Sequence, residues 1–303
     1  MDLHKLEIFC KVLELKSFSK AAEACLRSQP TVSEHIRYLE NLLAVRLFDR
    51  SGREVTATAA GEILYTYARK MLNVKRQAER ALQLHRGKMA GTLEVGGSTI
   101  PGQYVLPAII GRFKKQYAEI RIKLLIDDTM KISQLVLDGT VELGVVGARV
   151  NNGKLVFKKL FEDEMVLAVP PGHAWEGQTS VKLEQLTAAP FILREPGSGT
   201  RIMTVKLLED AGFAPQQLQV IAEMGSTDAT RQGIKAGVGV SILSKMAIRD
   251  DVRFGLIAQV PIRGLDLRRS FYLVTHKRRS LSPLGQAFVD FLFEIPQGSD
   301  MFP

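Results

Sequence analysis

The stretch SQPTVSEHIRYLENLL, residues 28–43, decides the fold of the N-terminal part of the chain. Its apolar residues recur at the spacing of one helical face: Val32, Ile36, Leu39 and Leu42 or Leu43. Ser28 can cap the free N–H groups of the first turn, and Pro30 is tolerated there because it has no N–H to offer. We therefore predict a helix that buries this face and presents small polar side chains outward from its first turn.

Two shorter helical patterns precede this stretch. The first covers residues 3–15, and the second begins at SFSKAAEAC, where Ser17 or Ser19 can cap it. Only LRS separates the second pattern from the third, so the two helices must turn sharply, as in a helix-turn-helix. In that motif the later helix inserts its N-terminal half into the major groove of DNA. Small polar residues there allow a close approach to phosphate, and Gln29 and Arg37 are long enough to reach base edges.

The segment AVRLFDRSGREVTATAAG, residues 44–61, predicts a β-hairpin wing after this helix pair. Leu47 and Phe48 are candidate core residues, and residues 54–58 are a candidate short strand. Arg50 and Arg53 lie in a basic turn between them and can contact backbone phosphate, although solvated loop charges have the same pattern.

The distribution of charge agrees with a nucleic-acid partner at one end of the chain. The net charge is +9, and residues 1–90 hold 16 Lys and Arg against 10 Asp and Glu, whereas the rest holds 25 against 22. A basic N-terminal unit beside a nearly balanced remainder favours attraction to double-stranded DNA. The N-terminus lacks the apolar core of a signal peptide, and no stretch approaches ~20 consecutive apolar residues. We expect a cytoplasmic protein without a membrane partner, with Cys10 and Cys25 as reduced, buried thiols.

A long helical pattern from Gly61 to Arg86 predicts a connecting helix. Apolar residues spaced three and four apart form a candidate coiled-coil seam: Leu64, Tyr67, Met71, Val74, Ala78, Ala81 and His85. Such a seam needs a partner, and a two-fold homodimer would present two reading helices to a pseudo-palindromic site. The alternative is that this face packs on its own domain.

The remaining residues predict an α/β fold, because short apolar strands alternate with helical patterns. We expect strands at residues 93–97, 120–127, 141–148, 164–170, 190–195, 217–223, 239–243 and 270–276. We expect helices at residues 103–117, 129–139, 200–212, 227–237 and 283–294. In an open sheet of this kind, ligands bind beyond the carboxyl ends of the strands.

Two loops in this part combine a strand end, glycines, hydroxyl groups and a helix start. GGSTIPGQY covers residues 96–104 and REPGSGTR covers residues 194–201. Backbone N–H groups and the positive end of a helix converge there, which is typical of an anion-binding site, although ordinary capped helix starts have the same composition. STDATRQ adds a third such helix start. The candidate ligand-binding residues are Ser98, Thr99, Gln103, Thr129, Ser198, Gly199, Thr200, Arg201, Ser226 and Thr227.

The stretch FSKAAEACLRSQPTVSEHIRYLENLLAVRLFDRSGREVTATAAGE resembles the winged helix-turn-helix of the LysR-type transcriptional regulators. The resemblance runs without a gap from about residue 3 to 64 and includes the AA pair, the SQPTVS helix start, I-x-x-LE, LFDR and T-x-AG in order. It implies that Arg50 and Arg53 lie in the wing. It also implies that the residues facing DNA are Ser28, Gln29, Pro30, Thr31, Ser33 and Arg37.

The resemblance further implies a division of the chain. Residues 1–60 would be the DNA-binding domain, residues 61–88 a dimerising linker helix, and residues 89–303 a two-lobed effector domain like a type 2 periplasmic binding protein. Lobe I would hold about residues 89–163 and 268–303, and lobe II about residues 164–267. The crossovers between the lobes would fall near residues 161–169 and 260–272. Family members form homodimers or homotetramers, and an activator would also contact RNA polymerase.

The effector loops are similar to those of one branch of the family. STIPG-x-Y-x-LP together with REPGSGTR resembles the regulators of sulfur assimilation, selenium metabolism and carbon fixation. This resemblance implies a small anionic effector, such as sulfite, sulfate or a related oxyanion.

Other classes of function find less support in the sequence. G-x-x-x-x-G-K-[ST] and G-x-S-x-G are absent, and the five histidines are dispersed without metal-ligand spacing. We therefore expect no enzyme, no metal and no cofactor. A solute-binding protein would require export, which the N-terminal helix pair argues against. A DNA-binding regulator without any ligand stays open as the alternative.

Overall fold

The computed structural model describes residues 2–49, 55–85 and 90–295. The chain forms two compact units. The N-terminal unit holds residues 1–88 together with residues 138–140, and the C-terminal unit holds residues 89–137 and 141–303. None of the described helices has an apolar stretch long enough to span a bilayer.

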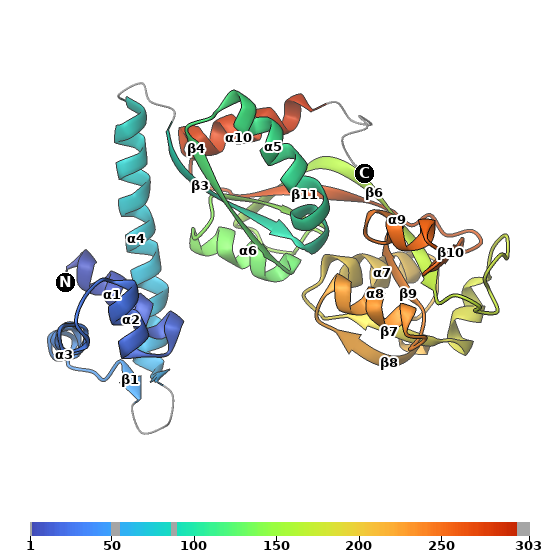
Figure 1. Ribbon diagram of the computed structural model, residues 1–303, viewed down its shortest axis with the longest axis horizontal. Helices are drawn as coiled ribbons and strands as arrows, with labels where there is room; N and C mark the ends of the chain where they lie inside the picture. Colours follow the sequence, from blue (N-terminus) through green and yellow to red (C-terminus); the bar gives the residue numbers. More distant parts are fainter. Residues whose placement is uncertain (1, 50–54, 86–89, 296–303) are drawn as a thin grey trace. The chain divides into compact units, whose positions relative to one another are not determined.

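Three short helices open the N-terminal unit: α1 (Leu3–Leu15), α2 (Phe18–Ala24) and α3 (Gln29–Leu43) (Figure 1). Their first turns are capped by Asp2, Ser17 and Ser28, whose side chains accept the N–H groups of His4, Lys20 and Thr31. The predicted cap Ser28 and the proline in the first turn of α3 are confirmed. One shared apolar core holds the three helices together, with Leu6, Phe9, Ala21, Val32, Ile36 and Leu39 among its buried residues.

The apolar face of α3 ends one turn earlier than predicted. Leu42 and Leu43 are 50% and 37% exposed, so neither completes the core. The helix stops at Ala44 in the left-handed conformation, and the chain then returns Leu47 and Phe48 to the core. These two later residues, both buried, contribute the apolar contacts that Leu42 and Leu43 do not make.

The buried carboxylate of Glu40 holds the segment that follows α3 against the core. Glu40 is 9% exposed, and its Oε1 atom accepts the backbone N–H groups of Leu47 at 2.8 Å and Phe48 at 3.5 Å. Strand β1 (Phe48–Asp49) then pairs antiparallel with β2 (Thr56–Ala57), which confirms a hairpin at this position. Arg50 and Arg53, predicted for its turn, lie outside the described residues.

The connecting helix α4 (Ala59–His85) begins two residues before Gly61 and has two apolar faces. Leu64 and Ala68 are buried in the core of the helix-turn-helix, with Met71 partly buried beside them. The seam prediction is therefore wrong for Leu64 and Met71, which face their own domain. Tyr67 and Val74 of the predicted seam are 59% and 63% exposed, and Ile63 is 62% exposed. Ala78 is also exposed. The side chains of Ala81 and His85 are not among those that the structure describes.

The C-terminal unit is built on a mixed sheet in the order β10-β6-β11-β5-β3-β4, with β9 also paired to β6. Its strands are β3 (Gly91–Ser98), β4 (Ile120–Asp127), β5 (Leu143–Val146), β6 (Leu155–Val169), β9 (Ser241–Ser244), β10 (Ala258–Val260) and β11 (Arg268–His276). β3 runs parallel to β4 and β5, whereas β11 runs antiparallel to β5 and β6. The predicted α/β class is confirmed, although the sequence patterns missed residues 155–163 of β6.

Two lobes are built around this sheet (Figure 1). In lobe I, the turn of π-helix at Pro101–Val105, α5 (Leu106–Gln116) and α10 (Pro283–Glu294) lie on one face of the sheet and α6 (Thr129–Asp138) on the other. Lobe II contains β7 (Pro190–Arg194) and β8 (Gln219–Met224) as a parallel pair, with α7 (Gly199–Asp210), α8 (Thr227–Lys235) and α9 (Lys245–Arg253). Short 3-10 turns at Leu183–Ala188 and Pro215–Gln217 complete this lobe. Helix α9 was not predicted.

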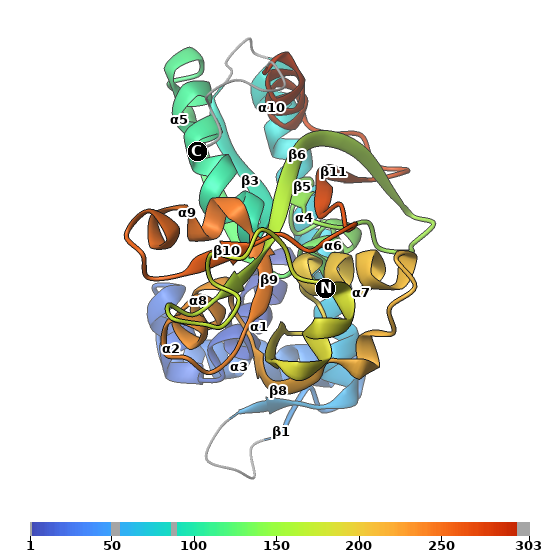
Figure 2. The ribbon, with the colours of Figure 1, turned by 90° about the vertical axis from the view of Figure 1, so that its right-hand side faces the viewer.

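Both lobes share β6 and β11, which lie side by side (Figure 2). The first part of β6 pairs with β11, and Met165–Ala168 pair with β9 of lobe II. The backbone N–H of Met165 donates to Leu267 at the point where the chain returns. The carboxyl ends of β3 and β7, which carry the two predicted effector loops, therefore belong to different lobes of one compact unit.

We expect replacement of Glu40 by leucine to destabilise the N-terminal unit. The substitution leaves the N–H groups of Leu47 and Phe48 buried without their acceptor, which costs about 1–3 kcal/mol in free energy of unfolding. Differential scanning calorimetry measures this loss. Glu40→Gln keeps an acceptor oxygen and should recover most of the stability. Glu34 is exposed on the same helix, and Glu34→Ala should change the free energy of unfolding by less than about 0.5 kcal/mol. An equal loss of stability in Glu40→Leu and Glu34→Ala would contradict the role of Glu40.

Candidate functional site

The first turn of α3 gathers the polar residues that were predicted to face DNA. Gln29, Pro30 and Arg37 are exposed, and Thr31 and Ser33 are partly buried. The Gln29 side chain donates to Ser33 Oγ at 3.1 Å. The Ser28 hydroxyl lies 2.8 Å from Thr31 Oγ1 and also accepts the N–H of Thr31. These bonds order short polar side chains at the positive end of a helix, where phosphate is favoured.

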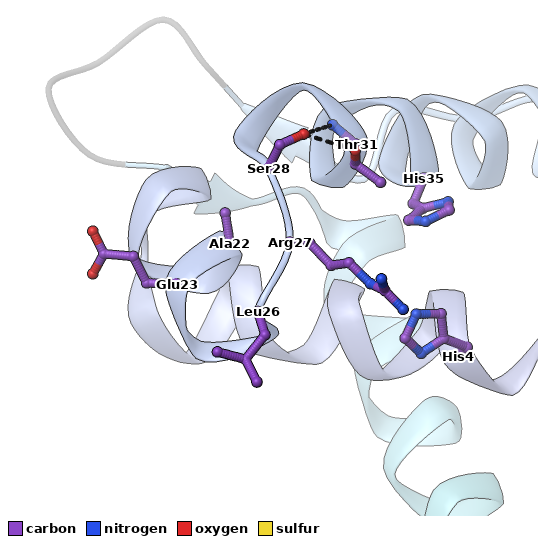
Figure 3. Close-up of a pocket in the computed structure, with 8 residues that line it drawn as sticks. All are labelled: His4, Ala22, Glu23, Leu26, Arg27, Ser28, Thr31 and His35. Atoms are coloured by element: carbon purple, nitrogen blue, oxygen red, sulfur yellow. Dashed lines mark hydrogen bonds between the residues drawn. The ribbon is translucent and has the colours of Figure 1, made fainter.

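An open hollow lies beside this helix start (Figure 3). Ser28, Thr31 and His35 border it from α3, His4 borders it from α1, and the turn between α2 and α3 contributes Leu26 and Arg27. Leu26 is 90% exposed and adopts a left-handed backbone conformation at φ 53°. The His4 and His35 rings meet edge to face at 6.1 Å. No group of three or more potential metal ligands occurs among the described residues, here or elsewhere.

The second group of predicted residues lies where the two lobes meet, which we call the lobe junction. Its hydroxyl-bearing residues are buried and come from both lobes: Ser98 and Thr129 of lobe I, and Ser198, Thr200 and Thr227 of lobe II. Ser98 Oγ accepts the N–H of Gly147 at 3.0 Å. The N–H of Met130 in α6 donates across the junction to the carbonyl of Gly197 at 3.2 Å. The structure therefore brings the two predicted effector loops to the same junction.

A buried arginine that the sequence analysis did not select crosses this junction. The Arg194 side chain is 1% exposed, and its Nε and Nη2 atoms bind the Glu195 carboxylate at 2.7 and 2.6 Å. Nη1 donates to Thr227 Oγ1 in lobe II, and Nη2 lies 3.4 Å from Thr99 Oγ1 in lobe I. One guanidinium group thus donates hydrogen bonds to hydroxyl groups of both lobes.

A second buried arginine lies at the start of β11. The Arg269 side chain is 1% exposed and its Nε donates to Asp163 Oδ2 at 2.7 Å, while Asp163 itself is fully buried. Nη1 donates to Thr200 Oγ1 at 3.2 Å, and Asp163 Oδ1 accepts the hydroxyl of Ser244 at 2.7 Å. Two buried polar atoms have no partner among the described residues: Arg269 Nη2 and Thr129 Oγ1.

Three other candidate residues, Arg201, Ser226 and Gln103, are engaged elsewhere or exposed. Arg201 is paired with Glu223 of β8 and donates to the carbonyl of Arg194 at 2.8 Å. Ser226 caps α8 by accepting the N–H of Ala229, and Gln103 is exposed. Gly199 belongs to the junction, since a Cβ atom there would lie 2.5 Å from Thr129 Oγ1.

A further contact between the lobes involves Tyr104, which follows Gln103 in the turn of π-helix. Burial raises the pKa of Tyr104, and the positive charge of Arg231 on α8 partly offsets this effect. The Arg231 guanidinium is held in turn by Asp251, with Nε 2.7 Å from Oδ2. Two arginines of lobe II, Arg194 and Arg231, thus lie beside the helix start of lobe I that follows β3.

Two family models match the chain and together cover most of it. Residues 3–62 match the bacterial regulatory helix-turn-helix protein of the lysR family, and residues 86–295 match the LysR substrate binding domain. The chain belongs to the LysR family of transcriptional regulators. This membership confirms the predicted family, the DNA-binding character and the expectation of a regulator in place of an enzyme.

Named relatives and solved structures agree with this assignment. The HTH-type transcriptional regulator CysL of Bacillus subtilis is 31% identical over 264 residues, which cover 87% of each chain. A probable RuBisCO transcriptional regulator of Cyanidium caldarium is 30% identical over 289 residues, covering 94% of this chain and 91% of that one. The crystal structure of full-length CbnR complexed with its target DNA has a TM-score of 0.73 at 21% identity, covering 96% and 99%. The last comparison shows a shared fold.

We expect the Asp163–Arg269 pair to behave as one unit in a double-mutant cycle. Asp163→Leu leaves the buried guanidinium without its counter-charge and should lower the free energy of unfolding of the C-terminal unit by about 3–5 kcal/mol. Arg269→Met should cost a similar amount, because it leaves a buried carboxylate. The double variant should be clearly more stable than the sum of the single losses implies. Urea unfolding measures all of these stabilities, and strictly additive losses would contradict the pairing.

Proposed function

We propose that this LysR-family regulator binds a pseudo-palindromic promoter site in double-stranded DNA and that a small anionic metabolite bound between its lobes modulates promoter binding or activation. A sulfur oxyanion or a related anion is the proposed effector. Residues 1–60 are the proposed DNA-binding domain, residues 61–88 the dimerising linker, and residues 89–303 the effector domain. A cytoplasmic location, where this DNA partner is found, is part of the proposal.

The exposed polar end of α3 supports the DNA-binding part of this proposal. Gln29 and Arg37 are exposed and long enough to hydrogen-bond base edges, while Ser28, Thr31 and Ser33 keep the helix start narrow. The apolar face of the same helix is buried in the domain core, so only the polar side is available to a duplex.

The lobe junction supports the effector part and is the observation that carries it. Hydroxyl groups from both lobes converge on two buried arginines, and two buried polar atoms there lack a partner among the described residues. Buried polar groups without a partner are costly in a folded protein, and a bound ion or water is one established explanation for them. A small anion that accepts hydrogen bonds would satisfy them and favour one relative position of the lobes.

The exposed side of α4 supports a homodimer. Ile63, Tyr67 and Val74 are more than half exposed and recur at four- and seven-residue intervals on one side of a 27-residue helix. A second copy of this helix would cover these side chains, and two-fold pairing suits a pseudo-palindromic site. Pairing of two dimers gives the homotetramer, and RNA polymerase is a further partner if the protein activates transcription.

We expect Gln29→Ala and Arg37→Ala to lose most of the discrimination between the regulator's own upstream promoter and unrelated DNA. Each removes a side chain proposed to read base edges, which costs about 1–3 kcal/mol in binding free energy. Electrophoretic mobility shifts at several salt concentrations between ~50 and ~200 mM measure affinity and its salt dependence, which should be steep because phosphate contacts release counterions.

The exposed Arg249→Ala in lobe II removes the same charge from the other compact unit and is the matched control. Wild-type binding that does not respond to salt, or equal promoter affinity of Gln29→Ala, Arg37→Ala and wild type, would contradict the proposed DNA surface.

We expect Thr99→Ala and Thr200→Ala to abolish the response to effector while leaving DNA affinity unchanged. Each removes a hydroxyl that a buried arginine holds at the lobe junction. Thermal shift with a library of oxyanions and small acidic metabolites detects the ligand, because binding to the native state stabilises it by mass action. Thr187→Ala, which removes a hydroxyl bonded within lobe II, is the control.

A wild-type protein that binds its promoter but is stabilised by no anion would favour the ligand-independent regulator. A normal effector response in both threonine variants would place the ligand elsewhere.

A further inference from the structure

A hollow lined only by basic residues and a glycine lies in lobe I, where β6 begins and β11 ends. Its lining residues are Gly153, Lys154, His276, Lys277 and Arg278, and its volume is about 340 Å³. Binding sites for small molecules have volumes of about 300–1,000 Å³, so this hollow suits a compact ligand. We call it the basic hollow.

The basic hollow is separate from the lobe junction. Strands β3 and β5 run parallel, and their carboxyl ends lie at the junction. Strand β11 runs antiparallel to β5, and its Thr275 pairs with Leu143, the first residue of β5. The end of β11 therefore lies at the amino ends of these parallel strands. Along β11, a rise of about 3.3 Å per residue places Arg269 of the junction and His276 about 20 Å apart.

Backbone hydrogen bonds order the segments that form the basic hollow. The N–H of Lys154 donates to Asn152 Oδ1 at 3.0 Å, and the N–H of Lys277 donates to the carbonyl of Lys154 at 2.8 Å. The N–H of Arg278 donates to His276 Nδ1 at 3.2 Å, so Nε2 carries the proton of the neutral ring. With these N–H groups in use, Lys154, Lys277 and Arg278 can bind a ligand only through their side chains.

The cations of the basic hollow are not neutralised by the described residues. Lys154, Lys277 and Arg278 are exposed, and within the described part of the chain their side chains form no ion pair and no hydrogen bond. Exposed cations elsewhere on or beside the same two strands are paired with carboxylates: Lys159 with Glu162, and Arg268 with Asp266. The hollow therefore concentrates three unpaired positive charges, which attract an anion.

The half-buried His276 shows that the surroundings of the basic hollow are positive. Burial lowers the pKa of His276, and the positive charges of Arg279, Lys154 and Arg278 lower it further. Arg279 donates to two backbone carbonyls at the end of α6, so its guanidinium is already engaged in the fold. All the charged side chains that shift this pKa are cationic, which favours a ligand with several negative charges.

We propose that the basic hollow binds a chain of linked phosphate groups, such as pyrophosphate, tripolyphosphate or the phosphate chain of a nucleoside triphosphate. The three unpaired cations come from two separate segments of the polypeptide. A ligand with several adjacent charges can contact all of them, and hydrogen bonds between ionised groups are stronger than neutral ones. This site is distinct from the proposed effector site between the lobes and does not depend on it.

The lining of the basic hollow favours a phosphate chain over an acidic peptide. No apolar side chain and no amide side chain lines the hollow, so it offers no pocket for the other side chains of a peptide. The guanidinium of Arg278 matches pairs of phosphate oxygens, and Lys154 and Lys277 add two point charges. A uniformly charged ligand therefore fits this lining best.

Isothermal titration of the full-length protein with tripolyphosphate, pyrophosphate and orthophosphate measures how affinity depends on the number of linked phosphates. The titrations are made at about pH 7.5, without divalent cations and at constant ionic strength, because salt screens exposed charges. We expect tripolyphosphate to bind at least ~10-fold more tightly than orthophosphate. Equal Kd values for tripolyphosphate and orthophosphate would overturn the proposal.

Two double variants locate the binding site. Lys277→Gln with Arg278→Gln removes two exposed cations of the hollow and should raise Kd for tripolyphosphate at least ~10-fold. Arg112→Gln with Lys115→Gln removes the same charges from exposed positions of α5 in the same lobe and should change Kd by less than ~2-fold. An equal loss of affinity in both double variants would show a general effect of charge and overturn the proposal.

Gly153 permits a second test with a control of the same shape. A Cβ atom on Gly153 would meet nothing within 4 Å, so a side chain there fits without disturbing the fold. Gly153→Glu brings a carboxylate to the hollow and should raise Kd for tripolyphosphate at least ~10-fold. Gly153→Gln has the same shape without the charge and should change Kd by less than ~3-fold. Wild-type affinity in Gly153→Glu would contradict the proposal.

Titration with a nucleoside triphosphate distinguishes the two sources of such a phosphate chain. A Kd equal to that of tripolyphosphate supports recognition of the phosphate chain alone, and a lower Kd supports a nucleotide as the ligand. If the variant with Lys277→Gln and Arg278→Gln loses affinity for duplex DNA of unrelated sequence and keeps wild-type binding of tripolyphosphate, this surface binds DNA and the proposal is wrong. Failure of every phosphate chain to bind also overturns it.

Discussion

The C-terminal unit depends on the buried Asp163–Arg269 ion pair, which lies where both crossing strands pass between the lobes. Asp163 belongs to β6 and Arg269 to β11, and neither side chain is more than 1% exposed. Desolvation of such a pair is expensive and is offset only when every remaining hydrogen-bonding group finds a partner. Ser244 and Thr200 supply two of those partners, so the pair links the crossing strands with α7 and with the start of α9.

This linkage explains how a small ligand could act on the whole unit. The lobes contact one another through polar bonds with demanding geometry: Met130 to Gly197, Arg194 to Thr99, and Arg269 to Thr200. Movement of one lobe breaks these bonds as a set, which favours a few discrete arrangements over a continuous range. An anion that satisfies Thr129 and Arg269 would stabilise one of them. Because the chain crosses between the lobes on paired neighbouring strands, that movement is restricted to bending or twisting at the crossings.

Local patterns in the sequence were sufficient for the helix-turn-helix and for the two hydroxyl-rich loops. The cap at Ser28 and the apolar spacing of α3 depend on residues within a few positions, and the structure confirms them. Leu42 and Leu43 were assigned wrongly because the place of Leu47 in the core depends on a chain reversal that helical spacing does not reveal. The partners of Arg269 and Arg194 were missed for a related reason: Asp163 is 106 residues from Arg269, and Thr99 is 95 residues from Arg194. No local pattern encodes such contacts.

The two apolar sides of α4 allow this helix to pass a rotation from one side to the other. Leu64 and Ala68 pack in the core that α4 shares with α1, α2 and α3. Tyr67 and Val74 lie on the exposed side of α4. Because one side of α4 is packed on this core, a rotation of α4 about its own axis also moves α1, α2 and α3. A partner bound to the outward side would therefore set the angle at which the first turn of α3 meets the proposed DNA groove, because a rotation of α4 by a few degrees displaces that turn.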